Sequence, residues 1–317
     1  MKVIEPLFLN ELKEAFEKAK EGLSNKKEPK KKLNELRQRI CNLKIFDPAC
    51  GSGAYLLGLL HELLGLRAAL FASRHVDGRT VYDRKLEIIQ NNLYGVDLDP
   101  FAVNIARLRL WLSLIVDFEG EGEPPPLPNL EFKIEDGDSL TAPDPSGGLQ
   151  PDLFRYGQVQ EYFKLKGDFL EAHGEQKIAL RDEVRALREK ISSWAHDGKV
   201  AGFDWQVEFA EVFAPELAKE TLSGEMAGLV NQAGGQMGLT AAPKEGGFDI
   251  VLANPPYVRQ ELLGDYKKDL KPVYPEVYTG TADLYVYFYG RAQQLLKKGG
   301  TACFISSNKC LKLALNL

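Results

Sequence analysis

The sequence has few cysteines and no hydrophobic run long enough to cross a membrane. Only four cysteines stand among the 317 residues, and none of them has the spacing of a metal-ligand set. We therefore expect no metal, and we interpret Cys41, Cys50, Cys303 and Cys310 as reduced core thiols. No run approaches the roughly 18 apolar residues of a membrane span, and the first residues lack a signal-peptide pattern. The sequence predicts a cytoplasmic protein without a membrane partner.

The chain also lacks an excess of positive charge. Its formal net charge of −5 argues against a generally basic, nucleic-acid-wrapping surface, because phosphate contacts need clustered Lys and Arg. Any affinity for nucleic acid would have to come from a local patch or another domain. The densest basic cluster, residues 26–32, lies between helical patterns at residues 9–23 and 33–40. We interpret it as a solvated loop between two helices.

What the chain does contain is an alternation of strand and helix patterns. The expected strands are residues 44–47, 93–97, 130–134, 248–253 and 301–306. The expected helices are residues 52–72, 83–91, 100–116 and 283–298, the last followed by a Gly-Gly turn. Such alternation predicts an α/β fold with a doubly wound, mainly parallel sheet.

A long segment interrupts this alternation. Residues 141–246 separate the third strand from the fourth, far more than the roughly 2 to 6 residues of an ordinary connection. Apolar positions from Leu170 to Ile191 predict an amphipathic helix or helical hairpin packed on the domain. Residues 221–242, rich in Gly, Ala and Gln, are expected to form a mobile loop beside the active site.

The most informative motif is Asn-Pro-Pro-Tyr at residues 254–257, directly after an apolar strand. Pro255 and Pro256 fix their φ angles at about −65° and disfavour helix before them, so the strand must leave as a stiff edge. The Asn254 amide carbonyl and the Pro255 backbone carbonyl can accept both N–H groups of an exocyclic amine. Tyr257 offers a flat face on which a flipped base can stack. The motif therefore predicts amino methylation.

Far upstream, an apolar strand ends at Asp47 and runs into a Gly-x-Gly turn that opens a helix. Gly51 and Gly53 allow the backbone to turn tightly and to approach a ligand. A dinucleotide is disfavoured, because the third glycine of its motif is replaced by Leu56. Asp47 can instead meet a positive group such as the ammonium of S-adenosyl-L-methionine.

Two more acids follow the second and third strands. Asp97 ends the second strand, the position at which ribose hydroxyls are bound in βαβ units. Asp99 is expected to cap the helix that begins at Pro100. Asp138 can accept from the adenine amino group of the cofactor. With Asn254, these acids should converge on one sheet edge, where a polar cluster is costly unless a ligand or water satisfies it.

These motifs, in this order, resemble those of the DNA adenine-N6 methyltransferases of restriction-modification systems, in particular type IIG enzymes and type I methylase subunits. DPACGSG at residues 47–53 is similar to the family's cofactor-binding motif, GVDLDP at 95–100 to its ribose-binding motif, and NPPY at 254–257 to its catalytic motif. Further similar segments stand at residues 203–205, 246–251, 283–288 and 304–309. The resemblance covers nearly the whole chain and implies a Rossmann-like methyltransferase fold.

The resemblance also implies which residues form the site. The implied cofactor-binding residues are Asp47, Pro48, Ala49, Cys50, Gly51, Gly53, Asp97, Leu98, Asp138 and Ser139. The implied catalytic residues are Asn254, Pro255, Pro256 and Tyr257. The chain then divides into N-terminal helices (1–42), a cofactor-binding half (43–140), a mostly helical insertion (141–246) and a catalytic half (247–317).

The expected partner is double-stranded DNA with its target adenine flipped out, together with a specificity or restriction subunit or domain. Two departures from the family lead us to expect truncation at both ends. The family's Val-Ile-Glu-Pro-Leu-Phe segment is already at residues 3–8, and the chain stops at Leu317, before the last strands and the target-recognition domain. We therefore expect this chain alone to be weakly active or inactive.

Other functions share parts of this pattern. Cytosine-N4 methylation of DNA also acts on an exocyclic amine, although Asn254 favours adenine modestly. RNA adenine methylation and protein glutamine-N5 methylation are alternatives, as is a catalytically silent assembly subunit. Cytosine-C5 methylation is disfavoured, because no cysteine follows a proline.

Overall fold

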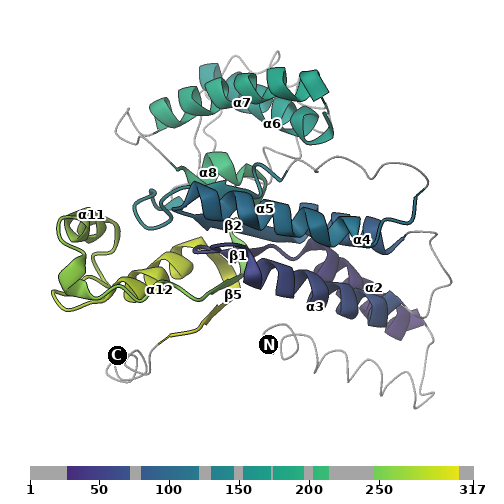
Figure 1. The fold of residues 1–317 in the computed structure, drawn as a ribbon, viewed down its shortest axis with the longest axis horizontal. Coiled ribbons are helices and arrows are strands. Elements are labelled where there is room, and N and C mark those ends of the chain that lie inside the picture. The colour runs from purple at the N-terminus through teal and green to yellow at the C-terminus, as the bar shows by residue number, and fades with distance from the viewer. Residues whose placement is uncertain are drawn as a thin grey trace.

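Five parallel strands form one sheet in the computed structural model of the chain (Figure 1). They are β1 Ile45–Asp47, β2 Leu93–Asp97, β3 Ile134–Asp136, β4 Phe248–Ala253 and β5 Leu296–Phe304. Their order is β3-β2-β1-β4-β5, so the direction in which strands are added reverses beside β1. This confirms the predicted doubly wound α/β fold. The structure describes residues 27–71, 80–120, 130–145, 153–172, 174–195, 203–213 and 246–306.

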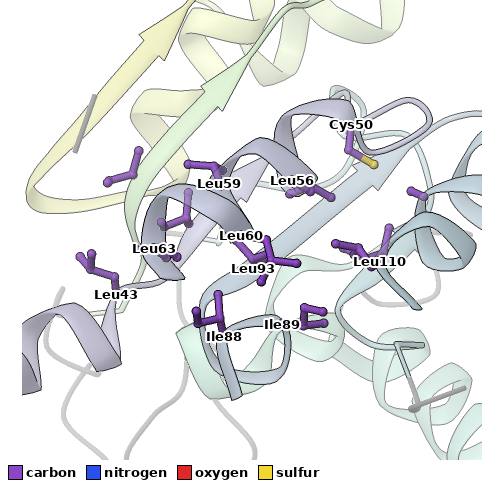
Figure 2. Close-up of a cluster of buried hydrophobic side chains, with 14 of the residues drawn as sticks. Leu43, Cys50, Leu56, Leu59, Leu60, Leu63, Ile88, Ile89, Leu93 and Leu110 are labelled. Atoms are coloured by element: carbon purple, nitrogen blue, oxygen red, sulfur yellow. The ribbon is translucent and has the colours of Figure 1, made fainter. Parts of the chain in front are cut away.

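One face of the sheet is covered by four helices. They are α2 Lys27–Asn42, α3 Ala54–Phe71, α4 Val81–Asn92 and α5 Pro100–Ile115. Ile45, Leu93 and Ile250 point to this face and pack with leucines and isoleucines of these helices. Figure 2 shows the side chains of Leu60 and Leu93 close together in this cluster, to which Leu110 also belongs. The predicted helices at residues 52–72, 83–91 and 100–116 are confirmed to within two residues at each end.

The opposite face carries aromatic residues and three helices. These are α8 Trp205–Glu208, α9 Ala210–Phe213 and α12 Leu284–Leu295. Because strand side chains alternate between faces, Phe46, Tyr94 and Val251 point to this side. The Phe46 ring lies 4.6 Å from that of Phe248 and 5.3 Å from that of Trp205. Trp205 belongs to one of the family-like segments, and its role in the described fold is to fill this core.

The insertion forms a pair of helices. α6 Leu153–Glu171 and α7 Gly174–Ala195 pack on each other and appear as a separate layer beside α8 in Figure 1. Gly174, with φ of +63°, begins α7 in a left-handed conformation that suits glycine. Residues 170–191, expected to form an amphipathic helix or a helical hairpin, include the end of α6 and most of α7. Residues 221–242, the expected mobile loop, lie outside the described residues.

Buried charges fasten this helical pair to the sheet. The Lys133 ammonium donates to the Tyr94 hydroxyl at 2.9 Å and to Glu211 at 2.7 Å. Lys166 of α6 lies 3.2 Å from the other Glu211 oxygen, and Arg188 of α7 pairs with Glu208 at 3.0 Å. Burial raises the pKa of Glu208 to about 8. Lys133 and Lys166 hold the pKa of Glu211 well below its usual range, against the opposing effect of its burial.

The remaining elements follow β4. The 3-10 helix η3 Gln260–Leu262 and helix α11 Tyr266–Val273 connect the end of β4 to α12. A hydrophobic cluster joins them, with Leu270 of α11 packed on Tyr287 and Phe288 of α12. Within the described ranges, no helix is both long enough and apolar enough to span a bilayer.

Three local predictions are wrong. Residues 27–32 begin α2 instead of forming a loop, and Pro29 is tolerated there because it lies in the first helical turn. Strand β3 begins at Ile134, four residues later than expected, because residues 131–133 form a turn with Phe132 at φ +71°. Strand β5 begins at Leu296, and the Gly-Gly pair lies in an irregularity between Leu296 and Thr301 instead of in a turn before the strand.

Candidate active site

The carboxyl ends of the parallel strands bring the predicted site residues to one edge of the sheet. Asp47 and Asp97 are the last residues of β1 and β2. Asp138 stands two residues beyond β3, and Asn254 directly follows β4. Ala49, Leu140 and Val258 also share one hydrophobic cluster, which places the loops after β1, β3 and β4 side by side.

The turn after β1 depends on two glycines with positive φ. Gly51 has φ of +51° and Gly53 has φ of +78°. A Cβ atom on Gly53 would stand only 2.9 Å from the Ala106 Cβ of α5, so no larger residue fits between this turn and that helix. The backbone N–H of Cys50 donates to the Val96 carbonyl at 3.0 Å, which fixes the turn on β2.

Asp47 is a buried acid with one unsatisfied oxygen. Its Oδ1 atom accepts from the Ala49 N–H at 3.1 Å. Among the described residues, no group hydrogen-bonds its Oδ2 atom, although that atom is buried. Burial raises the pKa of Asp47 to about 7; the Ala49 hydrogen bond opposes this rise and the Asp97 charge adds to it. A buried carboxylate with one unsatisfied oxygen fits a site that receives a cation.

Asp97 shapes the glycine turn from the neighbouring strand. Its Oδ2 atom accepts from the Gly51 N–H at 2.7 Å, and its Oδ1 atom from the Asp99 N–H at 3.0 Å. Asp99 itself caps α5 by accepting from the Phe101 N–H at 2.9 Å, which confirms its predicted role. Asp97 is half-buried, so lone pairs of both oxygens remain accessible from the sheet edge.

The other predicted cofactor-binding residues differ in what they expose. The Ser139 hydroxyl is buried and donates to the Pro48 carbonyl at 2.7 Å, which ties the loop after β3 to the loop after β1. Cys50 is also buried and lies at the edge of the leucine cluster in Figure 2. Leu98, in contrast, is 72% exposed beside Asp97. Pro48, Ser139 and Cys50 therefore support the loops at this sheet edge, whereas the Leu98 side chain is exposed.

Asp138 is held by three donors. Its Oδ1 atom accepts from the backbone N–H groups of Leu140 at 2.9 Å and Thr141 at 3.2 Å. The Tyr266 hydroxyl of α11 lies 2.9 Å from each carboxylate oxygen. The carboxylate is thus oriented both by its own loop and by the helix that follows the Asn-Pro-Pro-Tyr edge.

Residues 254–257 leave β4 as a tethered, partly exposed edge. Asn254 and Pro256 are exposed, and Pro255 is buried. Tyr257 is 53% exposed; its hydroxyl donates to the Ile305 carbonyl at 2.9 Å, and its ring lies 5.9 Å from that of Tyr285. The Ile305 N–H in turn donates to the Ala253 carbonyl at 3.0 Å. The tyrosine ring is therefore fixed in place with much of its surface available for stacking.

Sequence reasoning missed the residues that support these loops. Arg291 of α12 is fully buried and donates to the carbonyls of Leu140, Ala142 and Pro143. Tyr274 donates to the Leu140 carbonyl at 2.8 Å and accepts from Arg291 Nε at 2.8 Å. The one available signal was an arginine within the apolar helix pattern at residues 284–295, because such an arginine needs several acceptors when it is buried.

Comparison with known proteins decides the family. Residues 91–316 match the profile described as Eco57I restriction-modification methylase. The chain belongs to this family. Residues 23–120 also match the DNA-methyltransferase domain of MmeI, so Asp47 and Gly53 lie within the second match and Asp97, Asp138 and Asn254 within the first.

Curated relatives of this Eco57I-family chain are much longer proteins. A putative type II restriction enzyme and methyltransferase of Methanocaldococcus jannaschii is 28% identical over 86% of this chain and 26% of its own length. The adenine-specific methyltransferase BrxX of Escherichia coli is 24% identical over 82% of the chain and 20% of its own length. The structure of the type IIL restriction-modification enzyme MmeI in complex with DNA aligns with a TM-score of 0.47 at 20% identity, over 97% of this chain and 29% of that one. The chain thus spans about a quarter of the M. jannaschii relative.

Proposed function

We propose that this chain carries the catalytic centre of a methyltransferase that transfers the methyl group of S-adenosyl-L-methionine to the N6 amino group of adenine in double-stranded DNA. It would serve as the modification part of a restriction-modification system in the cytoplasm, with a specificity or restriction subunit or domain as its partner. The observation that carries the proposal is the meeting of Asp47, Asp97, Asp138 and Asn254 at one sheet edge. Relatives named as adenine-specific methyltransferases support adenine as the target.

The residues at this edge fit the cofactor. The buried and unsatisfied Oδ2 atom of Asp47 can receive the cofactor's ammonium group. Gly51 and Gly53 let the backbone approach without a Cβ in the way. Asp97 retains lone pairs for ribose hydroxyls, and Asp138 for the adenine amino group. The ammonium, the ribose hydroxyls and the adenine amino group of the ligand therefore each have a chemically matched group.

The neighbouring edge fits the amine that is methylated. The Asn254 side-chain carbonyl and the Pro255 carbonyl would accept the two N–H groups of the flipped base, which stacks on the exposed Tyr257 ring. When bound, the cofactor would supply an electrophilic methyl group, and the bond from this methyl group to sulfur would break as the amine lone pair formed the new N–C bond. Asn254 and Pro255 keep that lone pair out of the ring, and the surplus proton passes to water. No strong base is needed, because the methylated amine is acidic.

The proposal is tested with cofactor that carries a tritiated methyl group and genomic DNA that lacks methylated bases. We expect the wild-type chain to label the DNA weakly and Asn254→Ala to leave it unlabelled. Calorimetry should show that both proteins bind the cofactor equally, because Asn254 acts on the base and not on the donor. Equal DNA labelling by the two proteins, or a wild-type chain that neither binds the cofactor nor labels DNA, would overturn the proposal.

A further inference from the structure

A single hydroxyl connects the helix after the catalytic edge to the cofactor side of the site. Tyr266 is the first residue of α11, and its hydroxyl lies 2.9 Å from both carboxylate oxygens of Asp138, a residue 128 positions earlier in the chain. Sequence motifs account for Asp138 but not for Tyr266. The contact therefore has to be explained from the geometry.

The two oxygens of Asp138 are restrained differently. Its own loop restrains only Oδ1, through the backbone N–H groups of Leu140 and Thr141. Among the described residues, Tyr266 is the only donor to Oδ2. Without this hydroxyl, combined small rotations about the Cα–Cβ and Cβ–Cγ bonds could move Oδ2 while Oδ1 stays near its two N–H donors. The direction in which Oδ2 presents its second lone pair is therefore set by Tyr266.

We infer that Tyr266 is a positioning residue, which aims the Asp138 carboxylate at the exocyclic amino group of the cofactor's adenine. The inference rests on the proposed function, in which Asp138 binds that amino group. Orientation of this acceptor matters because a site built to bind an N–H group discriminates strongly against a ligand that lacks it. Tyr266 would thus contribute to selection of an adenine-containing cofactor without touching it.

Tyr266 is itself well fixed for this task. It is half-buried and packs against the cluster that contains Leu263 and Leu270. Its neighbour Lys267 donates to the Gly280 carbonyl at 2.7 Å, which anchors α11 to the segment before α12. Burial, together with the Asp138 charge and hydrogen bond, holds the pKa of Tyr266 well above its usual range. The hydroxyl therefore stays protonated and remains a donor at any working pH.

The contact between Tyr266 and Asp138 also links the base-binding edge to the cofactor side of the site. The Gln260 backbone N–H donates to the Asp283 side-chain Oδ1 at 2.9 Å, and the Leu284 N–H donates to the Val258 carbonyl at 3.0 Å. The segment that runs from the base-binding edge to α11 is thus pinned to the start of α12. The orientation of Asp138, the hydrogen-bond acceptor for the cofactor's adenine, is consequently set by the half of the domain that holds the base.

Tyr274 provides a matched control. Its hydroxyl also reaches the loop after β3, but it donates to the Leu140 backbone carbonyl and not to the Asp138 carboxylate. Tyr274→Phe and Tyr266→Phe each remove one oxygen from a tyrosine near α11. If cofactor affinity falls because the loop is loosened in general, it should fall after either change. If it falls because the Asp138 carboxylate is misoriented, it should fall only after the change at Tyr266.

The test measures the affinity of the 317-residue chain for S-adenosyl-L-methionine and for its analogue with hydrogen in place of the adenine 6-amino group. We expect Tyr266→Phe to bind the natural cofactor about tenfold more weakly, the size of one charge-assisted hydrogen bond, and to bind the analogue within about twofold of wild type. Tyr274→Phe should change both affinities by the same factor. Thermal melts followed by circular dichroism should show all three proteins folded.

Two outcomes overturn the inference while the proposed function stands. If Tyr266→Phe lowers the affinity for both ligands equally, or for neither, the hydroxyl has only a structural role. If Tyr266→Phe binds the natural cofactor more tightly, the hydroxyl competes with the adenine for Asp138 instead of aiming the acid. A wild-type chain that does not bind the natural cofactor defeats the proposed function and this inference together, which distinguishes the two kinds of failure.

Discussion

The Asp97 carboxylate accepts a hydrogen bond of 2.7 Å from the Gly51 backbone N–H. This contact joins the acid at the end of β2 to the glycine turn after β1, so the two motifs form one unit. Asp97 therefore fixes the turn, and we propose that its remaining lone pairs bind a ligand.

Removal of this acid should weaken cofactor binding. We expect Asp97→Ala to reduce the binding free energy of S-adenosyl-L-methionine by about 1.5–3 kcal/mol for each lost charge-assisted hydrogen bond, as measured by calorimetry. Asp99→Ala is the control, because Asp99 only caps α5. It should lower stability by about 1 kcal/mol and leave the affinity unchanged. Equal affinities of wild type and Asp97→Ala would remove Asp97 from the site.

Two glycine positions should respond oppositely to the same substitution. Gly53→Ala adds a Cβ that meets Ala106 at 2.9 Å on a backbone with φ of +78°, so we expect it to cost about 1–3 kcal/mol of stability and to weaken cofactor binding. Gly58→Ala in α3 meets nothing within 4 Å and should stabilise the helix by about 0.5–1 kcal/mol. Chemical denaturation measures both changes. A neutral Gly53→Ala would show that the turn tolerates a side chain.

The buried Asp47 predicts a pH-dependent stability. Its pKa is raised from 3.8 to about 7, first by burial. Since the folded chain holds this proton more tightly than the unfolded chain, the stability it contributes is complete below about pH 4, is lost as the pH rises to 7, and changes no further above that. The loss should be on the order of a few kcal/mol. Urea unfolding across this range should show a larger decline for wild type than for Asp47→Asn.

The same acid links cofactor binding to proton release. An ammonium group beside Asp47 favours its ionised form, so binding at pH 6 should release a proton from wild type and none from Asp47→Asn. Calorimetry in two buffers with different ionisation enthalpies measures this directly. Identical binding heats in both buffers would argue against contact between Asp47 and the ammonium.

The ion pairs of Glu211 should matter for folding and not for chemistry. Glu211→Ala leaves the buried Lys133 and Lys166 without this partner, and we expect a loss of about 3 kcal/mol. The lowered pKa of Glu211 means that its contribution is present above about pH 4.3, its unfolded value, and is lost as the pH falls further. Glu161→Ala, an exposed change on α6, should remain within about 0.5 kcal/mol of wild type. Similar denaturation midpoints for the two variants would contradict this account.

The fold was largely predictable from the sequence because its signals are local. Apolar strands that end in Asp47 and Asp97, and a helix that starts at Pro100 after a capping acid, lie where their patterns indicate. The start of β3 was not predictable, because the Glu135 side chain turns back to accept from the Phe132 N–H and holds a turn where an apolar run indicated strand. A side-chain capture of this kind leaves no periodic signal.

The candidate site was predictable only where motifs mark it. Asp138 could be selected from its place after a strand, but the contact from Tyr266 bridges 128 positions and exists only after the sheet has formed. Arg291 likewise reaches the Leu140 carbonyl over 151 positions. Such supporting contacts depend on tertiary packing, and they cannot be predicted from residue type or spacing.

The central claim is tested most directly by identifying the methylated base. Genomic DNA free of modified bases would be incubated with S-adenosyl-L-methionine and either the wild-type chain or Asn254→Ala, and then digested to nucleosides for mass spectrometry. The account predicts a low but measurable yield of N6-methyladenine with the wild-type chain and none with Asn254→Ala. Formation of N4-methylcytosine instead, or of equal N6-methyladenine with both proteins, would contradict it.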